Sequence, residues 1–93
     1  GIYRMILEAF LEHGRADIQA LDDALDRGVA EAVVPIAHRL KGASGNIAAS
    51  ALHGLCADLE AAARAGEVPE GAQDRLRAVG PATMDASRSW LRS

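Results

Sequence analysis

Glycines divide this chain into segments in which apolar residues recur every three or four positions. This spacing places the apolar side chains on one face of an α-helix. A glycine in the left-handed conformation commonly ends such a helix, and Gly14, Gly28, Gly45 and Gly66 follow four of these segments. The chain is therefore expected to form amphipathic helices that bury their apolar faces against one another.

The pattern predicts helices over residues 2–11, 16–27, 30–45 and 50–65. The residues expected on their buried faces are Ile2, Ile6, Leu7, Phe10, Leu11, Ile18, Leu21, Leu25, Val33, Ile36, Ala37, Leu40, Ala43 or Ser44, Ile47, Leu52, Leu55, Cys56, Leu59 and Ala63. Pro35 is expected to bend the third helix, because proline lacks the backbone donor that an interior helical residue supplies.

The last segment keeps a helical spacing that a proline interrupts. Pro69 and Glu70 suit a helix start. The apolar and small residues that follow at helical spacing are Leu76, Val79, Thr83, Ser87 and Trp90. A kink or two shorter helices are expected at Gly80 and Pro81. Together the segments predict an all-α fold, an antiparallel up-and-down four-helix bundle with a short additional N-terminal helix.

A histidine, the chain's only lysine and a glycine lie close together in the third helix. Lys41 and Gly42 follow His38 by three and four residues, so the three share one helical face. Neutral imidazole is a nucleophile, and an ammonium group can neutralise phosphoryl oxygens. Glycine inside a helix costs about 1 kcal/mol relative to alanine, and here it leaves room for an approaching partner. The arrangement suits reversible phosphorylation of His38.

The segment from Ala37 to Asn46 resembles the signature of the histidine-containing phosphotransfer (HPt) domain of bacterial two-component phosphorelays. That signature runs histidine, two residues, lysine, glycine and then small residues. The similarity extends over about residues 2–66, and it implies a four-helix bundle with the phosphoacceptor midway along one helix. By this resemblance His38 accepts the phosphoryl group and Lys41 stabilises it. The residues expected to dock the partner are Arg39, Gly42, Ala43, Gly45 and Glu60.

The resemblance also implies the chemistry and the partners. A neutral His38 takes the phosphoryl group from an aspartyl phosphate on a receiver domain and returns it to a second receiver, either of which can belong to a hybrid sensor kinase. The Mg²⁺ ion that such transfers require is expected on the receiver. The chain itself is expected to need no cofactor or metal. It shows no Gly-rich phosphate loop, so it should not act as an ATP-dependent kinase.

Length and composition are compatible with this interpretation. Ninety-three residues make a single domain, and Gly1 in place of an initiator methionine fits a fragment of a longer protein or a tag remnant. A net charge of −3 without a basic cluster argues against nucleic acid. No apolar stretch approaches the roughly 20 residues that span a bilayer, so no direct membrane contact is expected. One cysteine, Cys56, cannot form an intrachain disulfide. A monomer in the reducing cytoplasm is expected.

Two other classes of function remain open on the sequence alone. One is a helical adaptor that docks a receiver or a partner helix without phosphoryl transfer. The other is a metal-binding helical domain that uses His38, His53 and Cys56, although structural zinc sites require four ligands. His13, beside Gly14, reads as an ordinary surface residue at a helix end, and His53 reads as solvent-facing.

Overall fold

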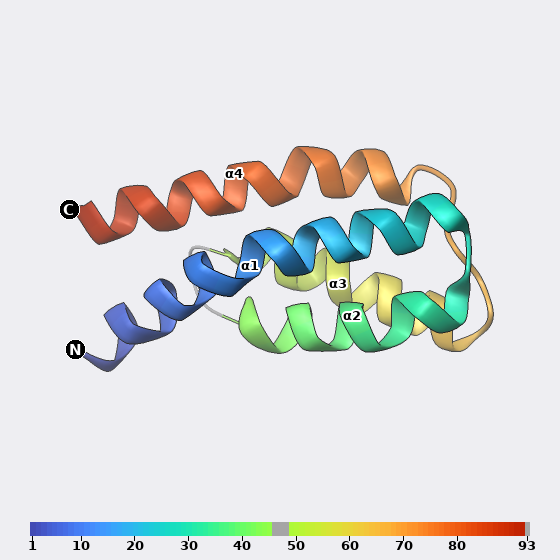
Figure 1. Cartoon of the computed structure of the whole chain (residues 1–93), viewed down its shortest axis with the longest axis horizontal. Helices are drawn as coiled ribbons and strands as arrows, with labels where there is room; N and C mark the ends of the chain where they lie inside the picture. The colour runs from blue at the N-terminus through green and yellow to red at the C-terminus, as the bar shows by residue number, and fades with distance from the viewer. Residues whose placement is uncertain (46–48, 93) are drawn as a thin grey trace.

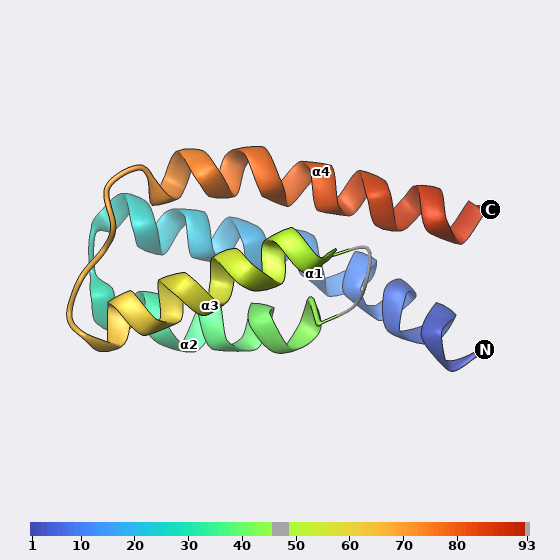
Figure 2. The same ribbon diagram turned by 180° about the vertical axis from the view of Figure 1, so that it is seen from behind.

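The computed structural model describes residues 1–45 and 49–92, and in these residues the regular structure is helical. Four helices follow one another: α1 (Ile2–Arg27), α2 (Ala30–Ala43), α3 (Ser50–Arg64) and α4 (Ala72–Arg92). Each helix runs back along the one before it, and both termini lie at the same end (Figures 1 and 2). Because α1 packs on α2 and α4, and α3 also packs on α2 and α4, the helices close into a bundle of 40 × 21 × 18 Å.

The four helices share one core, which their leucine-rich faces fill. Its apolar residues are Leu7, Phe10, Leu21, Ala24, Leu25, Val33, Ala37, Leu40, Ala49, Leu52, Leu55, Cys56, Leu59, Ala63, Ala72, Leu76 and Met84. Of the residues expected there, Ile2 and Ile6 are exposed, Ser44 rather than Ala43 is buried, and Ile47 lies outside the described residues. In the described part of the chain, no helix combines the length and apolar character needed to cross a membrane.

The separate N-terminal helix predicted from the sequence is wrong, because α1 continues unbroken through His13 and Gly14. Gly14 is buried, and a Cβ atom at this position would lie 3.2 Å from Cε1 of Phe10 and 3.4 Å from Sδ of Met84 in α4. This glycine therefore allows close packing inside the bundle and does not end a helix. The first turns of α1 extend beyond the end of α2 (Figure 1).

The break expected at Gly80 and Pro81 is also absent, since α4 runs from Ala72 to Arg92 as one helix. Pro81 has no N–H group to donate to the carbonyl group four residues earlier in the helix. Because Pro81 is exposed, that carbonyl group lies toward the solvent side. Gly80 is buried, and a Cβ atom there would lie 3.1 Å from Cγ2 of Ile18. Gly80 thus lets α4 approach α1 closely. Pro35 likewise lies exposed within an unbroken α2.

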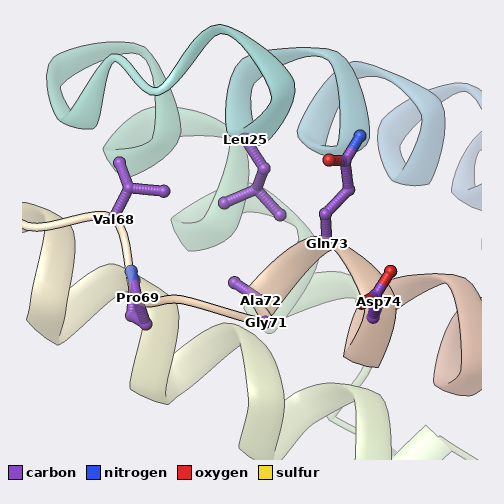
Figure 3. A pocket seen from close by; sticks show the side chains of 7 residues that line it. All are labelled: Leu25, Val68, Pro69, Gly71, Ala72, Gln73 and Asp74. Carbon is purple, nitrogen blue, oxygen red and sulfur yellow. The ribbon is translucent and has the colours of Figure 1, made fainter.

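The connections from α1 to α2 and from α3 to α4 lie at the end of the bundle opposite the two termini, and they hold the helices in register. Gly28 and Gly66 have φ angles of 67° and 83° and end α1 and α3, as the sequence predicts. The helix expected at Pro69 begins three residues later, at Ala72. Figure 3 shows Val68 of this connection beside Leu25 of α1, around a hollow of about 220 Å³. Gln73 donates from Nε2 to Oδ1 of Asp22 at 2.6 Å, which ties the start of α4 to α1.

Candidate functional site

His38 lies within α2 on the side that meets α3, and its ring is largely open to solvent. Its side chain is 64% exposed, while its neighbours Ala37 and Leu40 are fully buried. The Nδ1 atom of His38 lies 2.8 Å from Oε2 of Glu60, which α3 supplies. The helix pair therefore holds one edge of the imidazole ring and leaves the other edge free.

Glu60 is a nearly buried carboxylate with three partners. Its side chain is only 6% exposed, and its Oε1 atom lies 2.6 Å from Nζ of Lys41. Arg64, one turn along α3, donates from Nη2 and Nε to Oε2 at 2.7 and 3.2 Å. The contacts with Lys41, Arg64 and His38 lower the pKa of Glu60 to about 2, although burial acts in the opposite direction. Glu60 is therefore ionised at neutral pH.

The ionised state of Glu60 determines which nitrogen of His38 carries the proton. A carboxylate without a proton can only accept hydrogen bonds. The bond between Nδ1 and Glu60 therefore requires a proton on Nδ1, and in the neutral ring Nε2 then has a free lone pair. The site thus presents an imidazole whose exposed nitrogen is ready to act as a nucleophile.

The same carboxylate brings two cations next to His38. Lys41 and Arg64 carry two positive charges against the single negative charge of Glu60, so the site keeps a positive excess. Both cations border a shallow hollow of about 230 Å³, which Ala57, Glu60 and Ala61 also line. Sequence reasoning named Lys41 but missed Arg64. The signal was available, because Glu60 and Arg64 are four residues apart and such charges pair on a helix.

The remaining expected docking residues lie in three different settings. Gly42, Ala43 and Gly45 are exposed and line a groove of about 410 Å³ against α1. Arg39 instead turns toward α1, where Nη2 lies 2.9 Å from Oδ1 of Asp17. Glu60 lies beneath His38 and Lys41 and offers almost no surface to a partner. The structure therefore brings together His38, Lys41 and Glu60, and it leaves the glycine face open beside them.

The residues of the metal-binding alternative do not converge. His53 directs its Nδ1 atom to the backbone carbonyl of Lys41 at 2.8 Å. Cys56 lies in the core, and burial raises the pKa of its thiol to about 12, so the thiolate that binds metals is disfavoured. Within the described ranges, no three His, Cys, Asp or Glu residues are grouped so that they could hold a metal ion.

We expect Glu60 to make the stability of the fold sensitive to acid. An unfolded glutamate titrates near pH 4.3, whereas folding lowers the pKa of Glu60 to about 2. Between these values the unfolded chain binds a proton that the folded chain does not, so the free energy of unfolding should fall as the pH decreases through this window. Thermal melts between about pH 6 and 2 should show a shallower decline for Glu60→Gln than for the wild type.

An exposed glutamate provides the control for this effect. Glu12 lies on the solvent side of α1, and Glu12→Gln should follow the wild-type decline. Equal slopes for Glu60→Gln and the wild type would mean that the carboxylate beneath His38 is not linked to folding.

Comparison with known families agrees with the geometry of the site. The family model of the Hpt domain matches residues 5–88, a stretch that includes every residue of the cluster around His38. No curated protein and no solved structure matches the chain significantly.

Proposed function

We propose that this chain carries phosphoryl groups on His38 between receiver domains. The basis of the proposal is that the chain belongs to the Hpt domain family. Hpt domains are phosphotransfer modules of two-component phosphorelays, not kinases, and they interact with response-regulator receivers. One observation carries the assignment to His38: Nδ1 lies 2.8 Å from a nearly buried carboxylate, while the His38 side chain is 64% exposed.

In the forward step, Nε2 of His38 attacks the phosphorus atom of an aspartyl phosphate. The new N–P bond forms as the P–O bond to the aspartate breaks, and the aspartate leaves as a carboxylate. His38 keeps its proton on Nδ1, so the phosphorylated ring is positively charged. Glu60 lies 2.8 Å from that proton and can balance this charge. The carboxylate therefore orients the nucleophile and stabilises the product.

The two cations beside Glu60 suit the group that is transferred. Lys41 and Arg64 can turn from the carboxylate toward phosphoryl oxygens, which become close partners only when His38 is being phosphorylated. In the return step, a carboxylate of a second receiver attacks the phosphorus atom, the N–P bond breaks and its electron pair returns to Nε2. Neither step needs an additional base, because the attacking nitrogen begins without a proton.

The receiver is proposed to dock over Gly42, Ala43 and Gly45, beside the open edge of His38. These residues are exposed, and the groove that they line with α1 supports an approach from this side. We assign the Mg²⁺ ion of the transfer to the receiver, and we expect this chain to work as a monomer without a cofactor of its own. Cytoplasmic receivers are the expected partners, whether in a hybrid kinase or in separate proteins.

A labelling experiment tests this function. With ATP and Mg²⁺ alone the chain should remain unlabelled, because the proposed site takes its phosphoryl group from an aspartyl phosphate. Addition of a receiver phosphorylated by a small phosphodonor should give a phosphoryl group that acid removes and alkali does not. Labelling from ATP alone would contradict the proposal. Receiver binding without any labelling would identify the chain as an adaptor.

A further inference from the structure

His53 takes no part in the reaction proposed above, yet it holds the backbone of a residue that does. Its Nδ1 atom lies 2.8 Å from the carbonyl oxygen of Lys41, and a carbonyl can only accept, so Nδ1 carries a proton. The last carbonyl groups of a helix lack donors from within the helix. Lys41 stands in the last turn of α2, which ends at Ala43. His53 therefore supplies a donor to the end of the helix that carries the site.

The position of His53 on α3 relates it directly to Glu60. The two residues are seven positions apart, which is about two helical turns, so both lie on the face that meets α2. Glu60 contacts the side-chain nitrogen of Lys41 at 2.6 Å, and His53 binds the main chain of the same residue. Ala57 lies between them and borders the hollow beside Lys41. One face of α3 thus contacts both the side-chain nitrogen and the main-chain carbonyl of Lys41.

We infer that His53 is a positioning residue for phosphotransfer, acting through Lys41. This inference rests on the proposed function. Lysine has a long, flexible side chain, and the position of its ammonium group beside Glu60 depends on where the end of α2 lies along α3. The hydrogen bond from His53 to the Lys41 carbonyl fixes this position of α2 on α3, and the phosphoryl group itself stays on His38. Small displacements of a positioned group can reduce a reaction rate strongly.

The test compares the rate of phosphoryl transfer from a saturating phosphorylated receiver to wild type, His53→Ala and His53→Asn. Loss of one neutral hydrogen bond should slow His53→Ala about fivefold, with an unchanged receiver concentration for half-maximal rate. His53→Asn should recover the rate, because its amide nitrogen occupies nearly the place of Nδ1. Asp58→Ala, an exposed change on α3, serves as the control and should transfer at the wild-type rate.

A second background separates positioning from general stability. In Lys41→Gln the ammonium group is gone, so adding His53→Ala should cause no further loss of rate if His53 acts through Lys41. An equal loss in both backgrounds, or no recovery in His53→Asn, would overturn the inference. Nitrogen NMR of folded wild-type protein gives a test that needs no variant, since it should show His53 protonated at Nδ1.

The outcomes for His53 and for the proposed function are distinguishable. If the wild type accepts no phosphoryl group on His38, the function itself fails. If the wild type is phosphorylated and His53→Ala transfers at the wild-type rate, only the positioning role fails.

Discussion

Replacement of His38 by glutamine should reduce labelling by a phosphorylated receiver to background. The amide nitrogen of glutamine is not a nucleophile comparable with imidazole Nε2, so the variant offers no atom to receive the phosphoryl group at this position. The fold should persist, because the His38 side chain is 64% exposed and its buried neighbours are unchanged. Transfer of radiolabel from a phosphorylated receiver, measured beside circular dichroism, gives both quantities.

The other two histidines provide matched controls for this loss. His13 is exposed on α1, and His13→Ala should be labelled at the wild-type rate and to the wild-type extent. His53→Ala should reach the same final extent, because His53 positions the site and does not receive the group. Undiminished labelling of His38→Gln would show that the phosphoryl group enters elsewhere, and the central assignment would then be wrong.

Much of the fold could be predicted because apolar spacing reports the buried face of each helix. The buried residues predicted in α3, from Leu52 to Ala63, are all found in the core. Gly28 and Gly66 adopt positive φ angles where the helices were expected to end. The exposed positions of His38 and Gly42 also follow from their separation from the apolar stripe. These features depend on residues that are close in sequence, so a local pattern is sufficient.

The errors concern contacts between helices, which a local pattern does not report. Gly14 and Gly80 look like helix ends in the sequence, yet both are buried within unbroken helices where α1 and α4 approach closely. In a sequence, a glycine that ends a helix cannot be distinguished from a glycine that makes room for a neighbouring side chain. Only the identity of the facing atoms, Met84 for Gly14 and Ile18 for Gly80, separates the two roles.

The centre of the candidate site illustrates the same limit. Glu60 is 22 residues from His38, and the sequence alone placed it only among the residues expected to dock a partner. Its contacts depend on how far α3 slides along α2, and packing of the two helices places Glu60 under both His38 and Lys41. His53 binds the Lys41 carbonyl through the same register. Sequence reasoning therefore named His38 and Lys41 but did not predict that the Glu60 carboxylate contacts both of them.

Substitution of Gly42 by glutamate should slow phosphoryl transfer on the order of tenfold or more while the bundle remains folded. Apart from the adjacent residues and the backbone of α2 itself, no described atom lies within 4 Å of a Cβ atom at this position, so a side chain can be accommodated. Gly42 stands one helical turn from His38. Unit charges about 6 Å apart repel by about 0.7 to 2.8 kcal/mol between the dielectric of water and that of a protein surface. An incoming phosphoryl group and the acidic site of a receiver should both meet this repulsion.

Two companion variants separate the charge of the new side chain from its size. Gly42→Ala adds little bulk and should stabilise the bundle by up to about 1 kcal/mol with transfer near the wild-type rate. Gly42→Lys has bulk comparable with glutamate but positive charge, so it should transfer faster than Gly42→Glu at equal stability in thermal melts. If Gly42→Glu unfolds the domain, the glycine is needed for packing. If Gly42→Glu folds and transfers at the wild-type rate, the receiver approaches His38 over a different face. A negative charge one turn from His38 on the docking face would lower the rate of transfer.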